Sequence, residues 1–297
     1  MVKWYRDYGL EARMMLTMFL LSALYLFFLV VLYYYGGVGT SSLAVFAGAF
    51  MLIQFFFSDK LVLWSTGGRI VSEQEEPRLH ETISRLCAIA ELPKPKIAIV
   101  ESNVPNAFAT GRSKDSAVVA VTTSLKQRLS QPELEAVLAH ELTHVKNRDM
   151  LVITIASFLS TVAFFLVRSI LFFGLGSGGS RNRRDSGGAA LLWVVSLLVW
   201  IISFLLIRAL SRYREFAADR GSAIITGKPS NLASALIAIS GVMERVPDRD
   251  LREVEGMNAF FIIPAISSNS IMNLFATHPP IEARIRALRK MEREMVF

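Results

Sequence analysis

Cysteine is almost absent from this sequence, and its scarcity excludes the small secreted folds that depend on disulfides. The 297 residues include one cysteine, Cys87, so no intramolecular disulfide can form. A reducing compartment for the polar part of the chain is expected. We interpret Cys87 as a small buried apolar residue on a helix and not as a nucleophile.

Charged residues are also scarce and unevenly distributed. They make up 19% of the chain, whereas 53% is hydrophobic and the mean hydropathy is +0.42. The apolar residues come in blocks, which predicts membrane spans instead of one large soluble core. The net charge of +7 does not indicate nucleic acid, because no aromatic-basic binding module is visible and many Lys and Arg flank the apolar blocks. We therefore expect contacts with membrane lipids and none with nucleic acid.

The first 66 residues predict a transmembrane hairpin. Residues 14–35 and 43–64 are apolar runs long enough to span a bilayer. The first run is longer than the apolar part of a signal peptide and ends in tyrosines, with no small-residue cleavage site, so we expect a retained span. Basic residues flank the hairpin and its connecting turn carries none, which places both ends in the cytoplasm by the positive-inside rule.

A second pair of membrane segments is predicted within residues 150–210, at about 150–173 and 190–208. The link between them is rich in Gly and Ser and carries Arg181, Arg183 and Arg184. If both segments cross the bilayer, this basic link lies outside, against the positive-inside rule. The sequence favours two spans and leaves a partly buried hairpin as the alternative.

One helix is predicted to carry two metal ligands. Ser130 opens it as an N-cap, and Glu133 lies three residues on, where it can close a capping box. His140 and His144 are then one turn apart and face the same side, with Glu141 next to the first of them. The H-E-x-x-H pattern supplies two nitrogen ligands for zinc and a general base beside an open coordination position.

A third ligand is expected downstream. The apolar run ending near residue 208 continues without a helix breaker into a stretch that carries Glu215 and, one turn on, Asp219, with Gly221 near the expected helix end. A carboxylate here would complete a His₂Glu catalytic site, and Asp219 is placed to accept the N–H of a ligand histidine. Without the H-E-x-x-H motif, Glu215 and Asp219 would be interpreted as solvated helix residues. The presence of the motif favours roles for both in the metal site.

The remaining segments look soluble. Residues 67–149 and 211–297 are predicted to form the two parts of one cytoplasmic catalytic domain, the first with the H-E-x-x-H helix and the second with the third ligand. Short strands are predicted at 96–100, 107–111 and 117–123. The expected fold is an α-helical integral membrane protein with a mainly helical, α+β domain of the zincin type that carries a small antiparallel sheet.

Four stretches together resemble the HtpX group of the Ste24-type zinc metalloproteases, and the resemblance covers nearly the whole chain. They are residues 106–111, 140–144, 215–219 and 277–280. The resemblance implies that one zinc binds to three ligands and that a glutamate activates water. The ligands would be His140, His144 and Glu215, and the glutamate Glu141.

The same resemblance implies roles for residues around the ligands. Asp219 would orient a ligand histidine, with His140 as the expected partner. His278 and Arg284 would face the substrate carbonyl, although a histidine that only packs at a helix start is the alternative for His278. Substrate would lie along Asn106-Ala107-Phe108-Ala109.

The expected function is a multi-pass zinc endopeptidase of the cell membrane. It would cleave misfolded or damaged membrane proteins on the cytoplasmic side, in membrane quality control and the stress response. One alternative is a Ste24-like peptidase that processes specific substrates. Another is a non-catalytic zinc-binding membrane scaffold, whose closed site would need a fourth ligand such as Cys87 or His80.

Overall fold

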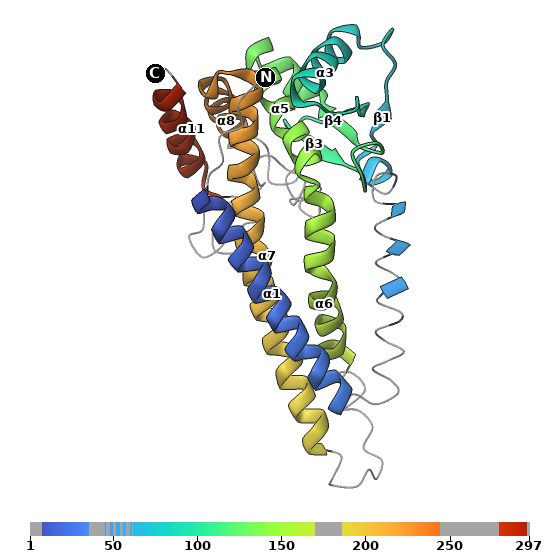
Figure 1. Ribbon diagram of the computed structural model, residues 1–297. Coiled ribbons are helices and arrows are strands. Elements are labelled where there is room, and N and C mark those ends of the chain that lie inside the picture. The colour runs from blue at the N-terminus through green and yellow to red at the C-terminus, as the bar shows by residue number, and fades with distance from the viewer. Residues whose placement is uncertain are drawn as a thin grey trace. The chain divides into compact units, whose positions relative to one another are not determined.

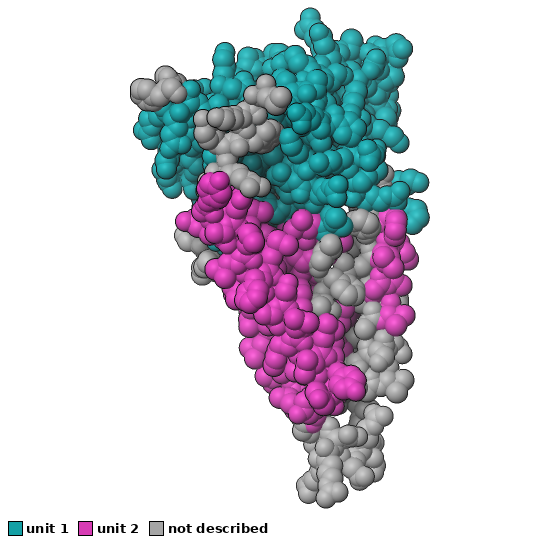
Figure 2. Space-filling view, in the orientation of Figure 1, with its two compact units in different colours: residues 1–7, 57–151, 211–297 teal, residues 8–56, 152–210 magenta. Residues whose placement is uncertain are grey.

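The structure is a computed structural model of the chain (Figure 1). It describes residues 8–35, 62–169, 186–243 and 279–295, together with single residues and pairs between 45 and 60. Half of the predicted span 43–64, most of the link 174–188 and His278 lie outside the described residues. The chain divides into two compact units, shown in Figure 2: residues 1–7, 57–151 and 211–297 in unit 1, and residues 8–56 and 152–210 in unit 2.

Unit 1 is an α+β domain, and helices make up most of its elements. Its strands are β1 (Arg69–Ile70), β2 (Lys96–Val100), β3 (Ala107–Thr110) and β4 (Val118–Thr122). Its helices are α3 (Pro77–Ala90), α4 (Thr123–Arg128), α5 (Gln131–Asn147), α8 (Pro229–Met243) and α11 (Ile281–Met295), with the end of α7 (Ser186–Thr226). The strands predicted at 96–100, 107–111 and 117–123 are confirmed to within a residue or so at their ends.

The sheet is mixed, whereas the sequence predicts an antiparallel one. The spatial order is β1-β2-β4-β3, with β4 antiparallel to β3 and parallel to β2. The difference arises because β3 turns back into β4 through a short link and β4 then inserts between β2 and β3. Chain direction alternates along the sequence, so the two neighbours β2 and β4 point the same way. All residues of β4 are buried, as expected for a central strand without charged residues.

The core of unit 1 lies between the sheet and its helices. Side chains of β4 alternate, with Val119 and Val121 on the helix-covered face and Val118 and Ala120 on the other. Cys87 is 3% exposed within the helix-covered core, which confirms the apolar interpretation. The same core takes apolar side chains from helices far apart in the sequence: Leu79 and Ile83 of α3, Val137 and Leu138 of α5, Leu232 and Leu236 of α8, and Leu288 of α11.

Unit 2 is built from α1 (Tyr8–Tyr35), most of α6 (Asp149–Ser169) and most of α7. Phe28 of α1 packs with Val162 and Val199 of the other two helices, and the Tyr25 hydroxyl donates to the Ala156 carbonyl over 2.5 Å. Among the described residues, α1 and residues 190–226 of α7 are long and apolar enough to cross a bilayer. The predicted segments 14–35 and 190–208 lie within these two helices, whereas the described part of 150–173 lies in α6, which is not one of them.

Helix α7 does not end near Gly221, as the sequence indicates, but continues to Thr226. Gly221 is instead a contact point with α5, because a Cβ placed on it would lie 2.3 Å from Cγ2 and Oγ1 of Thr143. One residue further, the Ser222 hydroxyl donates to the Ala136 carbonyl over 2.6 Å. Glycine at position 221 thus lets the end of α7 approach α5 closely. This contact helps to hold Glu215 and Asp219, which lie earlier on α7, against the motif helix.

Gly221→Ala should destabilise the protein, because the new methyl group overlaps the Thr143 side chain. We expect a loss of about 1–3 kcal/mol of unfolding free energy, as for other overpacked sites. Gly241→Ala on α8 is the matched control: its Cβ would meet nothing within 4 Å, so helix propensity should leave stability equal or slightly higher. Thermal unfolding of both metal-free variants in detergent tests this, and equal melting temperatures would contradict it.

Candidate active site

The motif helix α5 begins as the sequence predicts. The Glu133 carboxylate accepts hydrogen bonds from the Ser130 backbone N–H over 2.9 Å and from its hydroxyl over 2.8 Å, and the capping box is present. It also accepts one from the Ser234 hydroxyl of α8. From this start, His140 and His144 face the same side of the helix, with ring centroids 4.7 Å apart.

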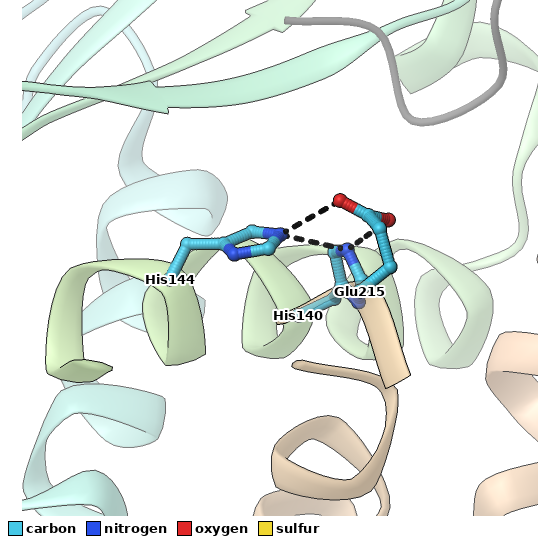
Figure 3. Close-up of side chains that lie close together, drawn as sticks. All are labelled: His140, His144 and Glu215. Atoms are coloured by element: carbon cyan, nitrogen blue, oxygen red, sulfur yellow. Dashed lines mark hydrogen bonds and ion pairs between the residues drawn. The ribbon is translucent and has the colours of Figure 1, made fainter. Parts of the chain in front are cut away.

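Three side chains from two helices converge on one point (Figure 3). The Nε2 atoms of His140 and His144 are 3.1 Å apart. Glu215 of α7 places Oε2 3.6 Å from Nε2 of His140 and Oε1 3.5 Å from Nε2 of His144. His140 and Glu215 are buried, whereas the His144 side chain is 18% exposed. The site is thus enclosed on the side of His140 and accessible at His144.

The geometry of these donors fits a tetrahedral metal ion. Each Nδ1 lies within 3.0 Å of an aspartate oxygen, which favours the tautomer with the proton on Nδ1 and the lone pair on Nε2. Two lone pairs at 3.1 Å repel unless a cation lies between them. At zinc–ligand distances of roughly 2.0–2.1 Å, a tetrahedral ion holds its donors about 3.3 Å apart, close to the separations observed. Three protein donors would leave the fourth position open.

Asp219 and Arg284 lie behind the first ligand. Oδ1 of Asp219 is 3.0 Å from Nδ1 of His140, and Arg284 donates to both oxygens of Asp219, over 2.9 and 2.6 Å. Nη1 of Arg284 is also 3.2 Å from Oε2 of Glu215. Arg284 is 1% exposed. Burial lowers its pKa, but the two carboxylates outweigh burial and raise the pKa above the usual range. This placement favours a positioning role for Arg284 over the expected contact with the substrate carbonyl.

Asp149 is a neighbour of the second ligand that the sequence analysis missed. Its Oδ2 lies 2.5 Å from Nδ1 of His144, and its Oδ1 lies 2.9 Å from Nε of Arg214. The chain reaches this position because α5 ends at Asn147 and the next residue, Arg148, is left-handed with φ of 55°. Glycine or asparagine would have marked such a turn in the sequence, whereas arginine does not.

The proposed general base lies beside strand β3. Oε2 of Glu141 accepts a hydrogen bond from the Ala109 backbone N–H over 3.0 Å. Burial raises the pKa of the Glu141 carboxyl, which makes its carboxylate a stronger base. The side chain of Phe108 packs on the other face of the sheet with Ala120, so in the expected substrate strand the backbone, and not this aromatic ring, faces the site.

The other expected site residues lie away from these ligands or outside the described residues. Among the described residues, the group that could hold a metal contains neither Cys87 nor His80. His80 is half-buried, with Nε2 3.0 Å from the Val71 carbonyl. Asn106 is 3% exposed at the start of β3. His278 lies outside the described residues.

Arg284→Met should be strongly destabilising, because it leaves the Asp219 carboxylate buried without its partner. We expect a loss of about 3–5 kcal/mol in unfolding free energy, the usual cost of breaking a buried ion pair. Arg286→Met, an exposed position on the same helix, should change stability by less than about 0.5 kcal/mol. Denaturant unfolding of the two metal-free variants compares their stabilities. Similar unfolding midpoints would show that the ion pair of Arg284 with Asp219 contributes nothing to stability.

Comparison with known proteins gives consistent matches over most of the chain. The profile of peptidase family M48 matches residues 73–292. Protease HtpX homolog 2 of Methanosarcina acetivorans is 66% identical over 293 residues, which is 99% of each chain. Protease HtpX homolog of Moorella thermoacetica is 58% identical over 289 residues, 97% of this chain and 96% of the relative.

A solved structure shares the fold. The crystal structure of S. mikatae Ste24p superposes with a TM-score of 0.59 over 94% of this chain and 66% of that chain. The sequences are 18% identical, so this likeness concerns the fold alone.

Proposed function

This chain belongs to peptidase family M48 and is a membrane metalloprotease of the HtpX type, and we propose that its metal is zinc and that it cleaves misfolded or damaged membrane proteins on the cytoplasmic side. The observation that carries the proposal is the convergence of His140, His144 and Glu215 beside a buried Glu141. A His₂Glu donor set with an open fourth position suits catalytic zinc. A closed structural site would need a fourth protein ligand.

The chemistry follows from the position of Glu141. When bound, zinc lowers the pKa of a coordinated water toward ~7 and polarises the scissile carbonyl. Glu141 takes the proton of the attacking water and delivers it to the leaving amine. The hydrogen bond that it accepts from the Ala109 N–H holds the carboxylate beside β3. Asp219 holds the His140 ring so that its Nε2 faces the metal position.

Strand β3 supports an unfolded polypeptide as substrate. It lies at one end of the described sheet, where β4 is its neighbouring strand and its Ala109 N–H donates to Glu141, so an extended peptide added at this edge would lie against the proposed base. Backbone hydrogen bonds of this kind recognise an extended chain and depend little on its side chains. This favours damaged or unfolded segments of membrane proteins, and thus a role in quality control and the stress response, over one defined processing site.

The central test compares the unmutated enzyme with Glu141→Gln, both purified in detergent. We expect one zinc per chain in both proteins, with cleavage of casein at many sites by the unmutated enzyme alone, because the amide cannot take a proton. A chelator should abolish cleavage and added zinc should restore it. Full activity of Glu141→Gln would overturn the mechanism, and zinc in both proteins with cleavage of casein in neither would favour the non-catalytic scaffold.

The cytoplasmic orientation is tested with a cysteine at Asp115, an exposed residue in the link between β3 and β4. Burial raises the pKa of the Cys87 thiol to about 11, so the native cysteine should give little background. Asp115→Cys should react with a membrane-impermeant maleimide in inverted membrane vesicles and not in intact cells. Labelling of intact cells would place the catalytic domain outside.

A further inference from the structure

We propose that Asp149 and Arg214 form a positioning pair for His144, and that this pair sets the affinity of the site for its metal. The inference rests on the proposed zinc-dependent function. It assigns a role to two residues that the mechanism above does not use.

The contacts form a continuous buried chain. Nδ1 of His144 is 2.5 Å from Oδ2 of Asp149, whose Oδ1 is 2.9 Å from Nε of Arg214. The side chains of Asp149 and Arg214 are 6% and 7% exposed. Burying two charges is costly unless each meets a partner of good geometry. Here one oxygen of the carboxylate lies against the imidazole and the other lies within ion-pair distance of the guanidinium group, so Asp149 is held between the two side chains.

His144 needs such support more than His140 does. The His140 side chain is 1% exposed, whereas that of His144 is 18% exposed and lies within the last turn of α5, which ends at Asn147. Packing therefore restrains the His144 ring less. A carboxylate on Nδ1 fixes both the rotation of the ring and its tautomer, and it increases the basicity of Nε2, the atom that faces Glu215.

The pair also links three helices, at the end of α5, the start of α6 and the interior of α7. Asp149 is the first residue of α6 and follows directly on the left-handed Arg148 that ends α5. Arg214 precedes Glu215 on α7. One carboxylate thus contacts a ligand on α5 and a side chain adjacent to the third ligand on α7. Loss of Asp149 would release the His144 ring and would also remove a tether of the α7 segment that carries Glu215.

The test measures zinc affinity by chelator competition and the visible absorption spectrum of the cobalt-substituted enzyme, for full-length protein in detergent. We expect Asp149→Asn to weaken zinc binding about 10- to 100-fold and to alter the cobalt spectrum, because the ring loses its charged partner. Arg214→Lys keeps the charge but not the planar geometry, so a smaller loss is expected. Glu135→Gln is the matched control on α5: it breaks the ion pair with Arg85 away from the ligands and should leave both readouts unchanged.

The outcomes separate the inference from the proposed function. An unmutated enzyme that neither binds zinc nor cleaves would refute the proposed function. An unmutated enzyme that does both, beside an Asp149→Asn variant of unchanged zinc affinity and cobalt spectrum, would refute the inference alone. In that case, a lower melting temperature of Asp149→Asn would show that the Asp149 charge stabilises the start of α6 and does nothing more. If Asp149→Asn does not fold, unchanged readouts in Arg214→Lys and Arg214→Met overturn the inference equally.

Discussion

The structure around the site depends on an electrostatic constraint: buried charges must be balanced. The charged side chains buried there are four carboxylates and two guanidinium groups, from Glu141, Asp149, Glu215, Asp219, Arg214 and Arg284. The carboxyl groups outnumber the guanidinium groups by two, and a divalent cation bound at the site would offset that excess. The two ring nitrogens 3.1 Å apart point to the same place for that charge. An excess of buried negative charge would otherwise be costly, so the metal position and the surrounding arginines are parts of one charge arrangement.

This arrangement is held by close contacts between two helices. Gly221 and Ser222 bring the end of α7 against Thr143 and Ala136 of α5. This approach of the two backbones places Glu215 of α7 near His140 and His144 of α5. Arg284 of α11 then contacts both Asp219 and Glu215, so a third helix restrains the segment of α7 that carries the third donor.

The sequence predicts those parts of the site that depend on the spacing of residues close together in the chain. His140 and His144 follow from the i, i+4 geometry of a helix, and Glu215 with Asp219 follows from a helix that continues without a breaker. The parallel pairing of β2 with β4 was missed because strand order is a long-range property. Asp149 was missed because its return to His144 depends on a left-handed arginine, a conformation that the residue type does not indicate. The burial of Arg284 depends on tertiary packing of α11, which periodicity alone cannot locate.

The split of the metal ligands along the chain has a consequence for biosynthesis. His140 and His144 precede α6, whereas Glu215 follows the apolar part of α7. A ribosome therefore releases the first two ligands before both apolar segments and the third ligand only after them. Until then the nascent chain has two imidazoles and a base but lacks the carboxylate that completes the donor set. The order of translation thus keeps the proposed donor set incomplete until both apolar segments have been made.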